Sequence, residues 1–189
     1  MAEILRQLRE EHGNMARLVI ALEHQLAIFD QGEQPDYDVL VAAADYFTGF
    51  SDRCHHPKED LIFRRMKEVD ATAARSLPNL DREHQELATL AQHFQEAVKN
   101  VLEEVEVARS AFDAVLRNFI GEQRRHMQME DDQFLPLAER VLTTKDWAEL
   151  DRIATKEDDP LFGAAASRAF QSLLRKILEW EREDEAQGR

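Results

Sequence analysis

The chain of 189 residues carries a formal net charge of −14, which argues against binding to nucleic acid or to an anionic membrane surface because both depend on clustered lysine and arginine. Its single cysteine excludes an internal disulfide framework and a metal site built from several thiolates of one chain. No stretch approaches the roughly 18 apolar residues of a membrane span, and the charged N-terminal residues lack the apolar run of a signal peptide, so we expect a cytoplasmic protein.

Turn signals divide the chain into helical blocks. Only six glycines and five prolines occur, and good helix formers dominate, so we predict an all-α protein. The predicted helices cover residues 3–30, 36–69, 80–105, 110–142, 146–154 and 163–183. The first four predict an up-down-up-down four-helix bundle over residues 1–142. Residues 143–189 then form a helical extension that packs on the bundle or on a partner in a homodimer.

Each of the first four helices carries an apolar stripe whose members recur in steps of three and four, the spacing that keeps side chains on one face. In every helix one position of the stripe is a histidine, and in the second and fourth helices a glutamate follows that histidine one turn later. These six core-facing residues are His12, His55, Glu59, His84, His126 and Glu130.

An internal repeat places these residues at one depth. Glu11-His12 recurs as Glu83-His84, 72 residues later, and the H-x-x-x-E-D pattern of residues 55–60 recurs 71 residues later. Residues on antiparallel helices lie at the same level when the connecting turn is midway between them, since both helices rise about 1.5 Å per residue. Every consecutive pair of the four histidines has its midpoint in a predicted turn. The four imidazoles therefore fall in one layer of the bundle.

A layer of six polar donors inside an apolar core indicates a metal site. Buried ionised groups cost several kcal/mol each unless they are paired or bound to a cation, and the stripes carry no basic residue. Imidazole and carboxylate donors suit iron, manganese or zinc, but six are too many for one tetrahedral zinc, so we predict two ions bridged by Glu59 and Glu130. Two divalent ions bring more charge than two glutamates neutralise, which favours a hydroxide or oxide bridge and leaves room for a small ligand.

These residues resemble the hemerythrin-like family, specifically its HHE cation-binding branch. The resemblance covers about residues 1–142 and rests on EH at 11–12, HHPKED at 55–60, EH at 83–84 and HMQME at 126–130. It implies that the four histidines are terminal iron ligands and the two glutamates bridging carboxylates of a non-heme di-iron centre. It therefore ranks two iron ions ahead of manganese or zinc.

The chain departs from oxygen-carrying hemerythrins at two positions. Those proteins carry a second histidine one turn after the one on the third helix, where this chain has Ala88. Their last carboxylate is an aspartate five residues after its histidine, and here Asp131 takes that spacing beside the stripe-facing Glu130. One imidazole fewer leaves the iron more open, which shifts the expectation from reversible oxygen carriage toward sensing, iron handling, or reaction with oxygen, peroxide or nitric oxide.

The function that we expect is a non-heme di-iron protein that binds dioxygen or a related small molecule in a sensing, storage or protective role. A di-iron oxidase, peroxidase or nitric oxide reductase is an alternative, and so is a regulatory module whose fold responds to iron. No stripe residue resembles a nucleophile or a general base, so we expect no catalytic side chain, and any catalysis would be the redox chemistry of the metal.

Five further histidines and aspartates lie beside the predicted donors or away from them. His24, His56 and His93 lie off the stripes, so we expect them at the surface or behind the ligands. Asp60 and Asp131 follow the two glutamates, where a solvated helix face fits better than a partner for an imidazole N–H.

Overall fold

The computed structural model describes residues 2–105, 108–154, 157–163, 168 and 170–187, with the side chains of 184–187 left out. The secondary-structure elements of the described residues are α-helices and π-helices, and no described residue lies in a strand. This confirms the predicted all-α class. No helix among the described residues is both long enough and apolar enough to cross a bilayer.

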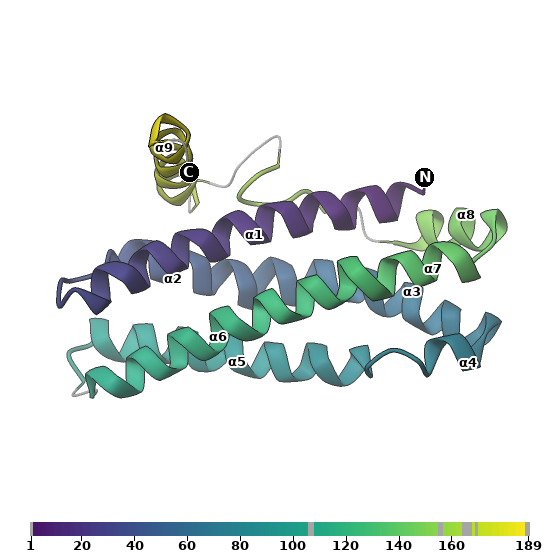
Figure 1. The fold of residues 1–189 in the computed structure, drawn as a ribbon, viewed down its shortest axis with the longest axis horizontal. Coiled ribbons are helices and arrows are strands. Elements are labelled where there is room, and N and C mark those ends of the chain that lie inside the picture. The colour runs from purple at the N-terminus through teal and green to yellow at the C-terminus, as the bar shows by residue number, and fades with distance from the viewer. Residues whose placement is uncertain (1, 106–107, 155–156, 164–167, 169, 188–189) are drawn as a thin grey trace.

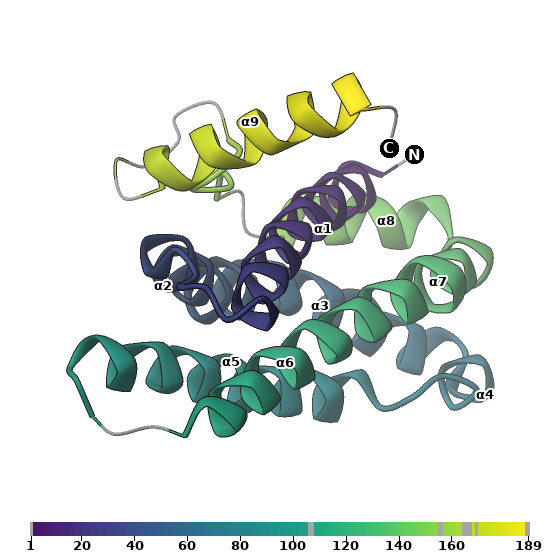
Figure 2. The same ribbon diagram turned by 60° about the vertical axis from the view of Figure 1, so that its left-hand side comes forward.

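Four rods form an up-down-up-down bundle, as predicted (Figures 1 and 2). The first rod is α1 (Glu3–Asp30), and the third is α5 (Leu80–Leu102). The second and fourth rods are continuous helices that each contain a π-helical segment, labelled η. Their elements are α2 (Tyr37–Tyr46), η1 (Phe47–His55) and α3 (His56–Val69), then α6 (Arg109–Met129), η2 (Glu130–Phe134) and α7 (Leu135–Val141).

Local chemistry fixes the ends of these rods. Gly32 has a positive φ of 85°, which ends the turn after α1 in a conformation that suits glycine. The carboxylate of Asp36 then accepts hydrogen bonds from the backbone N–H groups of Asp38 and Val39, a side-chain cap for the start of α2. The short helix α4 (Ala71–Ala74), which the sequence did not predict, lies in the connection between the second and third rods.

Apolar side chains pack on both sides of the histidine layer. One buried cluster runs from Met15 to Phe29 on α1 and includes Phe94 and Phe119 on the third and fourth rods. The other includes Leu5 and Leu8 at the start of α1, with further members on α3, α5 and α7. In the first three rods the core-facing histidine lies between the two clusters in sequence, and in the fourth rod His126 adjoins Met127, the last residue of that rod in the first cluster. The layer is therefore enclosed by hydrocarbon above and below.

The C-terminal extension packs on the bundle through α8 (Thr144–Ile153) and α9 (Gln171–Gln187). The carboxylate of Asp151 accepts hydrogen bonds from the backbone N–H groups of Glu3 and Ile4 at 3.1 and 2.8 Å, which holds α8 against the start of α1. The α9 helix lies across α1 and α2 (Figure 2), and Arg17 of α1 pairs with Glu181 at 2.6 Å.

The last helix begins later than predicted. We expected it from Gly163, but the described residues before Gln171 are in turns, and residues 164–167 and 169 lie outside the described part of the chain. The carboxylate of Asp159 accepts hydrogen bonds from the N–H groups of Leu161 and Phe162, while Gly163 N–H donates to the Asp159 carbonyl at 2.8 Å. A Cβ on Gly163 would lie 2.4 Å from that carbonyl oxygen. This glycine therefore belongs to a tight turn rather than to a helix.

Candidate metal centre

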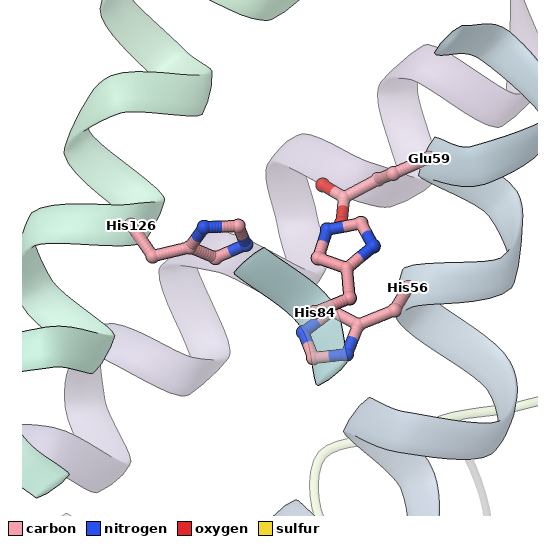
Figure 3. A group of neighbouring side chains, drawn as sticks. All are labelled: His56, Glu59, His84 and His126. Carbon is pink, nitrogen blue, oxygen red and sulfur yellow. The ribbon is translucent and has the colours of Figure 1, made fainter. Parts of the chain in front are cut away.

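All six predicted donors meet in one buried layer, together with a seventh residue, His56. Two groups of side chains each place their potential ligand atoms within 4.8 Å of one another, and Glu59 belongs to both groups. Figure 3 shows one of them, with His56 and Glu59 on the second rod and His84 and His126 on the third and fourth. The members of the other group are His12, His55, Glu59 and Glu130.

The two glutamates lie between the imidazoles. His12 Nε2 is 3.2 Å from Glu59 Oε1 and 3.3 Å from Glu130 Oε2, so this ring contacts both carboxylates. His84 Nε2 likewise lies 3.5 Å from Glu59 and 3.4 Å from Glu130. The other two rings approach the glutamate on their own rod. These distances are 3.3 Å for His55 Nε2 to Glu59 Oε1 and 3.0 Å for His126 Nε2 to Glu130 Oε1.

A carboxylate holds the opposite nitrogen, Nδ1, of each of the four rings. Such a partner fixes the ring orientation. A neutral imidazole that donates its Nδ1 proton to the carboxylate has a free lone pair on Nε2, and this nitrogen faces the layer. The four pairs join the rods in a closed circuit, each pair linking one rod to the next. They are Glu11 with His55 at 2.7 Å, Asp60 with His84 at 2.9 Å, Glu83 with His126 at 3.0 Å and Asp131 with His12 at 2.8 Å.

This circuit corrects one prediction and adds two residues. We expected Asp60 and Asp131 on a solvated face, and they are partly exposed, but each one binds an imidazole of the neighbouring rod. Glu11 and Glu83 were part of the sequence repeat without an assigned role. A residue beside a core-facing histidine points about 100° away around the helix, which directs it to the seam with the next rod. The repeated Glu-His dipeptide was therefore the signal.

The layer strongly favours positive charge. Burial opposes protonation of His12, yet the carboxylates of Asp131, Glu130 and Glu59 beside its ring raise its pKa well above the ordinary value. Burial also opposes protonation of His84, but Asp60 and the two glutamates raise its pKa to about 10. Burial opposes ionisation of Glu130, but its imidazole neighbours hold its pKa well below the usual range. Protons or metal ions can supply the charge that these carboxylates require.

Orphaned atoms show that metal ions fit this layer better than protons. Among the described residues, Glu59 Oε2, Glu130 Oε2 and His126 Nε2 are buried without a hydrogen-bond partner. His126 Nε2 lies near a carboxylate oxygen without the geometry of a hydrogen bond. Buried polar atoms are otherwise almost always paired, and atoms of these types are ligands for divalent metals. The donor set therefore fits a cation bound between the glutamates.

The protein-family comparison agrees with this geometry. A family model described as the Hemerythrin HHE cation binding domain matches residues 3–138, which span all four rods and every donor named above. The chain belongs to the hemerythrin HHE cation-binding family. Comparison with curated proteins and with solved structures gives no match.

One further histidine of this hemerythrin domain joins a donor group, although we expected it at the surface or behind the ligands. His56 is buried, and its ring stacks on that of His84 with 4.3 Å between centroids and 5° between planes. The cause is η1, whose wider turn changes the angle between successive side chains, so that His55 and His56 both face the layer. His93 is exposed, while His24 is half-buried beside Trp180, and neither joins a donor group.

A buried lysine also escaped prediction. Lys58 is 1% exposed, and its ammonium group donates a hydrogen bond to Glu11, the carboxylate that holds His55. Burial opposes ionisation of Glu11, but His55 and Lys58 together lower its pKa. Lys58 lies beside the apolar stripe of its helix rather than on it, so the helical periodicity did not indicate that it is buried.

Proposed function

We propose that this hemerythrin-like domain holds two iron ions between Glu59 and Glu130. We further propose that it binds dioxygen, or a related molecule such as nitric oxide or peroxide, in a sensing, storage or protective role. The observation that supports this proposal is the pair of donor groups that share Glu59. Two overlapping sets of ligand atoms with carboxylates between them suit two adjacent ions better than one.

The family resemblance favours iron among the metals that these donors suit. Imidazole nitrogen and carboxylate oxygen bind iron, manganese and zinc, and each of the two four-membered donor groups could also hold one tetrahedral zinc ion. Iron accepts higher coordination numbers and would retain an open position for a small ligand. Bound iron would supply the redox and ligand-binding chemistry.

The chain's own residues orient the donors and keep water out. The four carboxylates of the circuit hold each Nδ1 so that each Nε2 faces the glutamates. The apolar clusters above and below the layer surround it with hydrocarbon. Such an enclosure admits small uncharged molecules more readily than large polar substrates, which agrees with a diatomic ligand.

Metal analysis of the protein as isolated, combined with its visible spectrum, tests this function. The expected result is two iron ions per chain with the absorption of a coupled ferric pair, followed by a stable adduct when the reduced protein meets oxygen or nitric oxide. Zinc alone, or one ion per chain, would contradict the proposal. Repeated turnover in place of a stable adduct would instead identify a di-iron enzyme, while metal-dependent folding without any adduct would identify a regulatory module.

A further inference from the structure

The two halves of the bundle differ at a buried position beside the donors. The repeat that aligns His55 with His126 also aligns His56 with Met127. Both side chains are buried, at 5% and 7% exposure, so the scaffold buries this position in either half. Met127 belongs to the apolar core, whereas the first half places an imidazole there.

The nitrogens of His56 are poorly satisfied. Its Nδ1 is buried and has no hydrogen-bond partner among the described residues, although it lies 3.6 Å from Asp52 Oδ1. Its Nε2 is 3.4 Å from the hydroxyl of Ser51, at the outer limit of a hydrogen bond. A carboxylate behind Nδ1 is what the four other rings have at 2.7 to 3.0 Å, so Asp52 gives His56 the same arrangement in a looser form.

The unsatisfied ring lies at donor distance from the metal layer. One of its nitrogens is within 4.8 Å of the potential ligand atoms of Glu59, His84 and His126. Figure 3 shows these four side chains together. We propose that His56 is a fifth imidazole donor, serving the metal position of His84 and His126, so that the two positions carry three and two imidazoles. This inference rests on the proposed pair of metal ions. It assigns the additional imidazole to the second rod, while the third rod has Ala88 one turn after His84.

Binding requires the His56 ring to turn. An imidazole lies in a plane that contains its bound ion, so two rings bound to one ion cannot remain stacked with nearly parallel planes. Its nearest hydrogen-bonding groups are 3.4 and 3.6 Å away, and its ring otherwise contacts the rings of His84, His55 and His126. The four other rings are held by short bonds to carboxylates and need no such movement.

The test replaces His56 by the residue that the symmetric position carries. The full-length wild type, His56→Met and the control Met127→Leu are loaded anaerobically with ferrous iron, and iron per chain and the Mössbauer spectrum of the oxidised proteins are measured. We expect two unequal quadrupole doublets for the wild type and for Met127→Leu. We expect His56→Met to bind its second iron at least about 10-fold more weakly, because even partners behind a ligand change metal affinity by this factor. Two iron ions bound with unchanged affinity and unchanged doublets in His56→Met would overturn the inference.

A second measurement on the wild type does not depend on folding of a variant. In the protein loaded with Co(II) and labelled with ¹⁵N-histidine, ring N–H protons of metal-bound histidines shift far outside the diamagnetic range. Five such signals from the seven histidines are expected, and four would overturn the inference. A wild type that binds fewer than two ions would instead contradict the proposed function itself, so the two failures are distinguishable.

Discussion

The first and second halves of the bundle carry the same arrangement of sequence motifs and differ in the side chains at the buried positions beside them. Each half places a Glu-His dipeptide on one rod and an H-x-x-x-E-D motif on the next, and each contributes two links to the carboxylate circuit. The π-helical segment ends at His55, the first residue of the motif, in the first half and begins at Glu130 in the second. Polar side chains, His56 and Lys58, occupy buried positions that hold Met127 and Met129 in the second half. The repeated motifs can therefore form the donor layer, while the different side chains at these buried positions can make the two sides of the layer unequal.

Removal of a glutamate should have the largest effect and test the symmetry most severely. Because Glu59 and Glu130 both lie between imidazoles, we expect Glu59→Ala and Glu130→Ala each to lower metal affinity by more than about 100-fold, beyond the loss typical for residues behind a ligand. Equilibrium dialysis with ferrous iron measures this loss. His93→Ala, an exposed control, should bind metal like the wild type. A large loss from only one of the two glutamate variants would contradict the bridging assignment.

Lys58→Met should test the asymmetry through stability. This change leaves Glu11 without its buried ammonium partner, and breaking a buried ion pair costs roughly 3 to 5 kcal/mol. Urea unfolding of the metal-free protein gives the free energy of unfolding. The matched control at the symmetric position, Met129→Leu, should cost less than about 1.5 kcal/mol because it conserves volume and polarity. Similar losses for both variants would mean that Lys58 acts through packing alone.

The carboxylate circuit should respond equally in both halves. Asp60→Ala and Asp131→Ala each remove the partner of one imidazole, on His84 and His12 respectively. We expect either change to weaken iron binding by about 10- to 100-fold while the helix content remains unchanged. Competition with a chelator of known affinity measures the effect. Affinity that stays at the wild-type level would show that these bonds do not orient the rings for metal.

The sequence could predict which six residues meet in the buried layer because helical periodicity and the repeat act on the same residues. The i+4 spacing put Glu59 beside His55, and the turn midpoints gave the common depth. His56 escaped prediction because the wider turn of η1 changes the angular phase that the stripe analysis assumes to be constant. The role of Asp60 depends on the position of the neighbouring rod, which the periodicity of a single helix does not contain. Prediction therefore succeeded where a helix is regular, and it failed at the π-helical segment η1 and at the seams between helices.

The pH dependence of stability tests the charge of the layer without any substitution. The pKa of His84 is raised to about 10 in the metal-free fold, so its charge stabilises the folded state fully below the unfolded value of 6.5. That contribution is lost as the pH rises through about 10. We expect the free energy of unfolding of the metal-free protein to fall by up to about 4 kcal/mol between pH 7 and pH 10, since the pH rises by roughly three units and one unit corresponds to about 1.4 kcal/mol. Metal-loaded protein, measured in parallel, should lose less.

The most direct measurement is anomalous X-ray diffraction at the iron edge from crystals of the iron-loaded protein. Two anomalous peaks are expected between the carboxylates of Glu59 and Glu130, one within bonding distance of His12 and His55 and the other within bonding distance of His84 and His126. One peak, or peaks outside this layer, would contradict the claim that the repeated motifs of the two halves build a single two-metal centre.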